Sequence, residues 1–155
     1  MPSHVILAVI LALTVWQPDE TLRRYGAADH EWHLEMLRGT PFNARATITF
    51  PARNRIAGMA PCNSYTSTNI MPYPWIKVGP IAATRRACPD LDAEAAYFDA
   101  LRAARVAVVE GDTLTLSDED TPLLVFRVSV LIKLFLASTR GLGGRVRWPV
   151  RSSFA

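Results

Sequence analysis

The chain contains only two cysteines, and this single pair constrains its fold more than any other feature. Cys62 and Cys88 stand next to Asn63 and Pro89, and no Cys-x-x-Cys motif occurs. In an exported chain, one pair is first interpreted as one disulfide, which would close a loop of about 27 residues and stabilise the fold by about 3 kcal/mol. The alternative is that Cys88, near a predicted helix start, is a low-pKa thiol with a redox role.

The N-terminal residues favour export. Residues 5–16 form an apolar run of signal-peptide length, too short for a membrane span of about 20 residues. Residues 1–17 are therefore predicted as a signal peptide and residues 18–30, which are polar and mixed in charge, as a linker. The alternative is an apolar N-terminal segment buried in the core, because residues 1–4 carry no Lys or Arg.

Composition excludes several classes of protein. Half of the residues are apolar, which is enough for one packed domain and argues against disorder. The last 28 residues hold five of the 17 basic residues and none of the 14 acidic ones, so residues 1–127 are mildly acidic. The main body therefore has no nucleic-acid-binding signature. Residues 128–155 form a basic apolar tail that could extend a strand, lie on a membrane or be an unselected appendage.

Alternating hydrophobicity predicts a protein built mainly of β-strands. Period-two patterns and β-branched residues predict strands in seven stretches: 31–36, 44–50, 55–60, 63–68, 75–81, 106–116 with a tight turn at 110–112, and 123–127. One helix is predicted at about 90–104, with Leu91, Ala95, Phe98 and Leu101 on its apolar stripe. The fold class is α+β, mostly β, with an antiparallel or barrel-like sheet packed against that helix.

Several short sequence motifs occur together in an order that resembles one family. They are Trp32-His-Leu34, Leu37-x-Gly39, Gly58-x-x-x-Cys62-Asn63-x-Tyr65, Thr84-x-x-Ala87-Cys88, Glu94 with Phe98 and Leu101, Gly111-Asp-x-Leu114-x-Leu116, and Leu124-Val-Phe126. Over residues 31–127 they resemble the META domain, also called the HslJ-like domain. The resemblance implies a small sheet that clasps one helix, in bacterial envelope proteins that are secreted, periplasmic or lipid-anchored. It implies no established catalytic mechanism.

Two positions beside the cysteines depart from the family pattern. Pro61 stands where the family usually has Gly, so the local turn must differ, because proline lacks an N–H and excludes positive φ. Arg86 stands where the family favours Met, and we expect its side chain to face solvent or an acid. The tail after Arg127 has no family counterpart.

No catalytic set, cofactor site or metal site is predicted. His30, His33 and Glu35 do not have the spacing of a zinc motif on a helix and fit a solvated strand face. The acidic stretch 118–120 lacks calcium-loop spacing and fits a turn. Asn63 is the polar residue that stands out, because a short amide beside a cysteine can close a turn by bonding the backbone.

These observations support two functional hypotheses. The first is a non-enzymatic, exported, monomeric META-type domain with an envelope or stress-response role. It would bind an unknown envelope component or protein, and its N-terminal segment or tail could associate with a membrane. Gly58, Asn63, Thr84 and Glu94 would be its structural motif. The alternative is a carrier of a small apolar ligand, with Tyr73 and Trp75 lining a barrel-like pocket.

Overall fold

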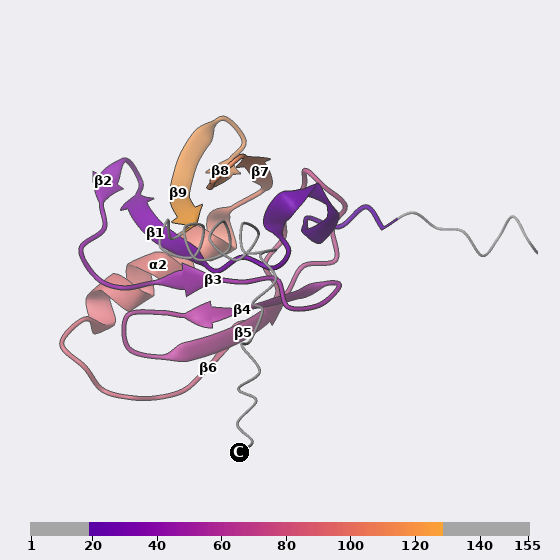
Figure 1. The fold of residues 1–155 in the computed structure, drawn as a ribbon. Helices are drawn as coiled ribbons and strands as arrows, with labels where there is room; N and C mark the ends of the chain where they lie inside the picture. The colour runs from indigo at the N-terminus through magenta and orange to yellow at the C-terminus, as the bar shows by residue number, and fades with distance from the viewer. Residues whose placement is uncertain (1–18, 129–155) are drawn as a thin grey trace, which may run out of the picture.

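The computed structural model describes residues 19–128 of the chain (Figure 1). The predicted signal peptide, and the predicted tail apart from Val128, lie outside the described residues. In chain order the elements are η1 (Arg23–Ala27), β1 (Trp32–Leu37), β2 (Thr40–Pro41), β3 (Thr47–Ile48), β4 (Arg55–Met59), β5 (Ser64–Thr68), β6 (Ala82–Ala83), α2 (Leu91–Ala103), β7 (Val106–Glu110), β8 (Thr113–Asp118) and β9 (Thr121–Val128).

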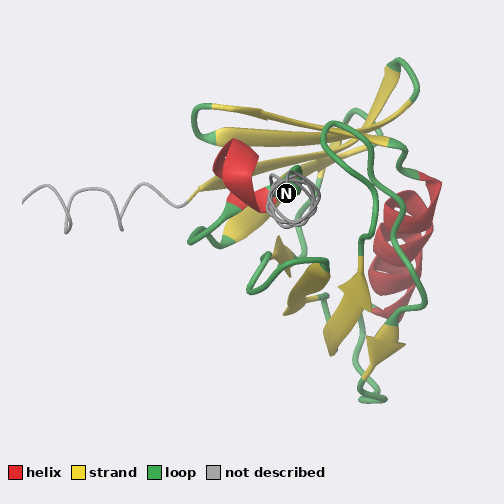
Figure 2. Cartoon of the chain, turned by 90° about the vertical axis from the view of Figure 1, so that its right-hand side faces the viewer, coloured by secondary structure: helices red, strands yellow, loops and turns green. Residues whose placement is uncertain are grey.

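The strands form two antiparallel sheets. The six-stranded sheet has the order β2-β1-β9-β8-β7, with β3 paired to β1, and the three-stranded sheet has the order β4-β5-β6. The helix α2 packs against the strands on one side of the molecule (Figure 2). The predicted fold class, mostly β with antiparallel sheets and one main helix, is confirmed.

Isolated bridges and single hydrogen bonds join the two sheets into a barrel-like arrangement. Thr49 bridges Ala57 on β4, which links β3 to the smaller sheet. On the other side, Trp75 bridges Val106 on β7, and Gly79 donates to the carbonyl of Thr68 at 2.9 Å. The segment from 75 to 83 thus runs from the edge of β7 to the edge of β5.

The prediction of a regular strand at 75–81 is wrong. Only the bridge at Trp75 and the two-residue β6, farther along the chain, are regular pairings in this region. Pro74 and Pro80 explain the difference, because proline has no N–H to donate and interrupts a ladder wherever it faces a neighbouring strand.

The core lies between the sheets and the helix. Its largest fully buried side chains are Trp32, Ile48, Ile56, Ile76, Tyr97, Leu101, Leu114, Leu116, Leu124 and Phe126. The inward stripe of α2 differs from the predicted one, because Leu91 and Ala95 are exposed whereas Glu94 and Tyr97 are buried. Side-chain chemistry explains the shift, since Glu94 and Tyr97 have polar partners inside the domain that hydrophobic periodicity does not register.

Residues 19–30, which were predicted as part of a linker, contribute to the packed domain. Leu22 and Ala27 are buried in the core, and the indole N–H of Trp32 donates to the carbonyl of Ala27. The guanidinium of Arg23 donates to the carbonyl of Phe50. The polar composition of 18–30 concealed two apolar anchors at Leu22 and Ala27. No described helix is long and apolar enough to cross a membrane.

Candidate functional site

The turn between β4 and β5 holds the carboxylate of a buried glutamate. The backbone N–H groups of Cys62 and Asn63 both donate to Oε2 of Glu94, each at 2.9 Å. In an ordinary β-turn the N–H of Asn63 would bond the carbonyl of Ala60, but here Ala60 N–H donates to the Asn63 carbonyl instead. Two successive N–H groups around one carboxylate form an anion-binding nest, occupied by a side chain of α2.

The side chain of Asn63 makes four hydrogen bonds and is itself buried. Its Nδ2 donates to Glu94 Oε1 at 2.7 Å and to the Arg86 carbonyl at 3.3 Å. Its Oδ1 accepts from Thr84 Oγ1 at 2.8 Å and from Arg86 N–H at 2.7 Å. An amide offers two donors and two acceptor sites, so this side chain is saturated by the fold.

The predicted disulfide between Cys62 and Cys88 is present, with the two Cα atoms 5.7 Å apart. It therefore ties the same turn to the same 84–94 segment that Asn63 and Glu94 hold. Pro61 fits this turn because Glu94 accepts hydrogen bonds from the N–H groups of Cys62 and Asn63 and needs none from residue 61. The side chain of Arg86 is exposed, as predicted, while its backbone pairs with Asn63.

Gly58 lies at the corner where β4 passes over β3. A Cβ at this position would lie 2.1 Å from the carbonyl oxygen of Thr47. This distance is too short for a residue with a side chain to fit unless the backbone shifts. The hydroxyls of Tyr65 and Tyr97 converge on the same carbonyl at 3.1 and 3.2 Å, and lie 2.7 Å from each other. The two hydroxyls have two protons for three contacts, namely one to each other and two to the Thr47 carbonyl. Only two of these contacts can therefore be hydrogen bonds at the same time.

Burial raises the pKa of Tyr65 and Tyr97 well above the ordinary tyrosine value of 10.0. The cause is the loss of hydration that a buried phenolate would suffer. Both groups therefore stay protonated in the folded state at physiological pH. Their roles are those of a hydrogen-bonded core pair, in edge-to-face contact with ring centroids 5.9 Å apart.

The polar residues considered for a metal lie on the surface. Glu35 pairs with Arg127 at 2.9 Å, and both side chains are more than half exposed. His30 contacts the edge of Trp32, with ring centroids 5.6 Å apart. Within residues 19–128 there is no group of three or more His, Cys, Asp or Glu side chains placed to hold a metal ion.

Tyr73 is half-buried against the core, whereas Trp75 is exposed. The ring of Tyr73 stacks on Tyr25 with centroids 4.1 Å apart and planes 8° apart, and Trp75 is 52% exposed. The inner space is filled by the core side chains, and none of the four depressions around the β3–β4 turn includes Tyr73 or Trp75. These four depressions therefore give the apolar-carrier hypothesis no support.

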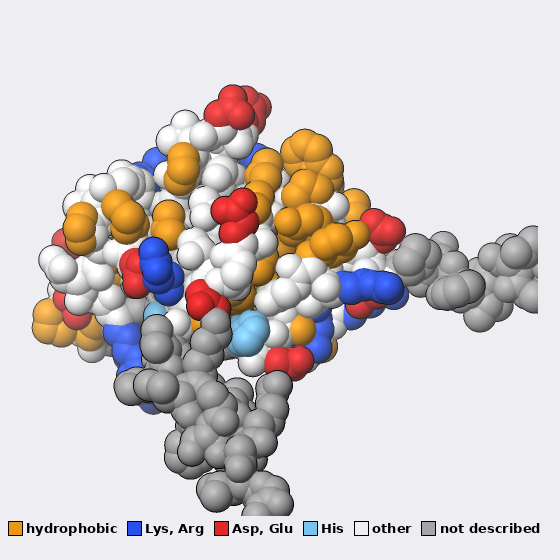
Figure 3. All heavy atoms as spheres, turned by 45° about the horizontal axis from the view of Figure 1, so that its top comes forward, with side chains coloured by type: hydrophobic (Ala, Val, Ile, Leu, Met, Phe, Trp, Pro, Cys, Tyr) orange, Lys and Arg blue, Asp and Glu red, His pale blue; other side chains and the backbone are white. Residues whose placement is uncertain are grey.

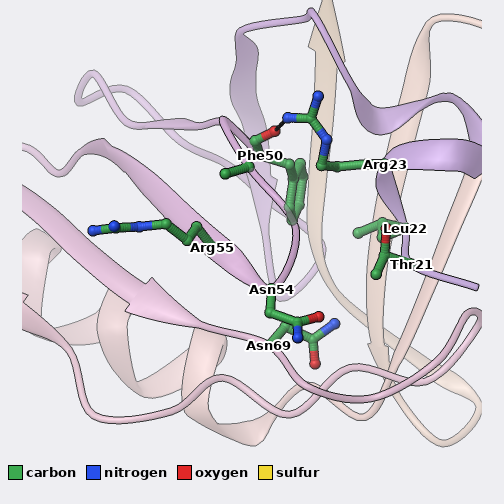
Figure 4. Close-up of a pocket in the computed structure, with 8 residues that line it drawn as sticks. Thr21, Leu22, Arg23, Phe50, Asn54, Arg55 and Asn69 are labelled. Carbon is green, nitrogen blue, oxygen red and sulfur yellow. Dashed lines mark hydrogen bonds between the residues drawn. The ribbon is translucent and has the colours of Figure 1, made fainter. Parts of the chain in front are cut away.

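The depressions surround the β3–β4 turn and are lined mainly by polar residues. Open ones of about 260, 370 and 210 Å³ lie around this turn. A smaller cavity of about 10 Å³ lies beneath it (Figure 4). In that view the amides of Asn54 and Asn69 lie close together, and Arg55 extends away from Thr21. The small volume matches a single water molecule.

The structure thus brings Asn63, Thr84 and Glu94 together and places Gly58 at a separate corner of the same hairpin. Sequence reasoning missed Tyr97, Thr47 and Tyr25. Tyr97 stands one residue before the predicted stripe member Phe98, so a search for polar-tipped aromatics next to the stripe could have found it. The role of Thr47 rests on its backbone carbonyl, which leaves no signal in the sequence.

Comparisons with known proteins identify a family and a fold. The family model described as META domain matches residues 25–130, more than half of the chain. No curated protein matches the chain. A solved NMR structure of a protein from Burkholderia xenovorans is similar with a TM-score of 0.55 and 22% identity, covering 74% of this chain and 93% of that one. A second NMR structure has a TM-score of 0.52 and 19% identity, covering 66% and 92%. These two likenesses show the fold alone.

Proposed function

This chain belongs to the META domain family, and from that premise we propose that it is a non-enzymatic, exported domain with an envelope or stress-response role. It acts by binding a component of the bacterial envelope. The observation that carries the proposal is the Cys62–Cys88 disulfide, because such bonds persist in oxidising compartments and are rare in the cytosol.

The arrangement of polar groups supports a non-enzymatic role. A catalytic base or nucleophile needs a polar atom that can reach a substrate. The polar atoms of Glu94 and Asn63 are instead hydrogen-bonded to each other, to the β4–β5 turn and to the backbone of Arg86. The buried tyrosine pair is likewise closed within the core.

Protease accessibility of the full chain in a Gram-negative host tests the proposal. After the outer membrane is permeabilised, added protease should reach the protein while a cytoplasmic marker stays intact. Degradation must be scored on reduced samples, because the Cys62–Cys88 disulfide holds together the fragments of a chain cleaved between the two cysteines. Survival of the protein together with the cytoplasmic marker would contradict export.

A further inference from the structure

Acidic side chains are absent from a long stretch of the chain that includes the smaller sheet. Residues 36–89 hold seven basic residues and no acidic one, and β4, β5 and β6 all lie within them. The acids lie before and after this stretch, and Figure 3 shows acidic side chains at the tip of the protruding β8–β9 hairpin. A surface with charges of one sign raises the local concentration of ligands of the opposite sign. The smaller sheet is therefore suited to an anionic ligand.

An open groove of about 370 Å³ lies on the outward face of this sheet. In the sheet, Arg55 on β4 is opposite Thr68 on β5, and Thr66 is opposite Ala82 on β6. All four residues are exposed and line the groove, whereas Ser67, between the two threonines, is buried. The small side chain of Ala82 leaves room for a ligand beside Thr66.

Three polar side chains of the groove are free to bind a ligand. The guanidinium of Arg55 and the hydroxyls of Thr66 and Thr68 have no hydrogen-bond or ion-pair partner among residues 19–128. Arg53, on the β3–β4 turn, adds a second guanidinium, and no described acidic side chain lines the groove. A guanidinium donates paired N–H groups to two oxygens of one oxyanion, and each hydroxyl can donate one more hydrogen bond. The lining therefore suits an oxyanion.

The two arginines of the groove are not equivalent. Arg53 also lines a neighbouring depression of about 210 Å³ together with Glu20. Hydrogen bonding by Thr21 lowers the pKa of Asp19, and the charge of Arg53 lowers this pKa further. Acids across the turn thus balance part of the charge of Arg53, whereas no described acid pairs with Arg55. Arg55 is therefore the main anion contact.

We propose that this groove binds the phosphate group of a small phosphate ester, with Arg55 and Arg53 on the phosphate oxygens and the two threonine hydroxyls as further donors. The inference deepens the proposed function, on which it rests for the source of the ligand, because it gives the bound envelope component a chemistry.

Charge and size select a phosphate ester over a carboxylate. A phosphate monoester carries about −1.5 to −2 charges at neutral pH and three acceptor oxygens, so it can neutralise two guanidinium groups and also accept from hydroxyls. A carboxylate carries one charge and would leave one guanidinium without a counter-charge. Small-molecule sites in proteins begin at about 300 Å³, so the groove has room for an organic group beside the phosphate.

An NMR titration with glucose 6-phosphate tests the proposal. The purified, oxidised full chain is titrated with glucose 6-phosphate, glucuronate and glucose at constant ionic strength. We expect glucose 6-phosphate to shift the backbone amide signals of Arg55, Thr66, Thr68 and Ala82, with a Kd of about 1 mM. Glucuronate should bind more weakly, and glucose should cause no shift. Added salt should weaken the binding, because part of it is electrostatic.

A second arm of the experiment distinguishes a soluble ester from a lipid headgroup. Sedimentation with phosphatidylcholine vesicles that contain phosphatidic acid, whose headgroup is a phosphate monoester, measures the lipid source. Binding of glucose 6-phosphate without sedimentation would assign the groove to a soluble ester. Sedimentation that depends on Arg55 would assign it to a headgroup, and either result supports the phosphate site.

Matched variants separate the groove from the net charge of the chain. Arg55→Gln should weaken glucose 6-phosphate binding about ten-fold, because a charged hydrogen-bond donor is lost. Arg38→Gln removes the same charge from the exposed β1–β2 turn of the other sheet (Figure 1), and this control should bind like the parent chain. Thr66→Val, which keeps the shape of the side chain, should weaken binding about five-fold. Near-ultraviolet circular dichroism checks that the variants keep their packing.

Four outcomes would overturn the phosphate site. They are no binding in either arm, equal binding by Arg55→Gln and Arg38→Gln, equal binding of glucuronate and glucose 6-phosphate, and shifts confined to signals of residues 129–155, which carry basic side chains of their own. These measurements use purified protein and do not depend on export in cells. Failure of the phosphate site is therefore distinguishable from failure of the proposed function.

Discussion

The carboxylate of Glu94 accepts two hydrogen bonds from Asn63, one from its backbone N–H at 2.9 Å and one from its side-chain amide at 2.7 Å. This contact joins the first turn of α2 to the β4–β5 turn, next to the disulfide. Because Glu94 is buried, these bonds replace the water that a carboxylate would otherwise need. The relationship makes Glu94 a structural anion in a nest of backbone donors.

We expect Glu94→Gln to lower the free energy of unfolding by about 2 kcal/mol. Hydrogen bonds to a charged acceptor are stronger than those to a neutral amide, and the NH₂ group of the glutamine would face N–H donors that now bond the carboxylate. Urea denaturation of the oxidised protein measures the loss. Asp92→Asn is the control on the same helical turn, since Asp92 is exposed, and it should change stability by a few tenths of a kcal/mol at most. Equal stability of the two variants would contradict the nest.

Asn63→Asp should destabilise the fold at neutral pH and recover at low pH. The substitution places a second carboxylate where an amide donor now lies 2.7 Å from Glu94 Oε1. Like charges at this distance repel, whereas one shared proton restores a donor. The difference in unfolding free energy between variant and parent should shrink as pH falls. A difference that is constant from neutral to acidic pH would argue against direct contact between the two side chains.

The buried tyrosine pair predicts a loss of stability at alkaline pH. Because the folded-state pKa values of Tyr65 and Tyr97 lie above the unfolded value of 10.0, the unfolded chain loses these protons first. Stability is therefore full below pH 10.0 and falls as pH rises above it, by about 1.4 kcal/mol per pH unit for each tyrosine. Tyr65→Phe should halve the tyrosine-dependent slope in denaturant titrations. An unchanged slope would mean that Tyr65 is not protected from ionisation in the folded state.

Gly58→Ala should destabilise the domain by about 3 kcal/mol, because its Cβ would meet the carbonyl oxygen of Thr47 and force β3 and β4 apart. Thermal and urea unfolding measure this effect. Gly111→Asn is the matched control: no atom lies within 4 Å of its added Cβ, and Asn tolerates its positive φ of 57°. A Gly58→Ala variant as stable as the control would show that the two strands can separate at little cost.

Much of the fold follows from local sequence patterns. Alternating hydrophobicity located β1, β4 and β5, and the Glu110-Gly111-Asp112 turn marked the β7–β8 hairpin. The motifs that resemble the META domain led to the family assignment. The helix bounds were accurate to about one residue, but its inner face was not, because Glu94 is drawn inward by donors on a turn 31 residues earlier. Periodicity reports hydrophobicity, and it cannot report a distant backbone donor.

The same limit explains the other differences. Leu22 and Ala27 are two anchors in a polar segment, and only the packed sheet shows what they touch. The stretch predicted as a strand at 75–81 has suitable apolar residues, but Pro74 and Pro80 lack the N–H groups that a regular ladder uses. The rings of Tyr25 and Tyr73 stack although the two residues are 48 positions apart in the sequence, because they meet only through the tertiary fold.

The thiol state of the protein recovered from cells tests the central claim most directly, namely that Cys62 and Cys88 form the staple of an exported domain. Cells that produce the full chain are quenched with acid, and the protein is alkylated under denaturing conditions with and without prior reduction. Intact mass spectrometry should find no alkyl group on the unreduced protein and two on the reduced protein. Two alkyl groups without reduction would contradict the account.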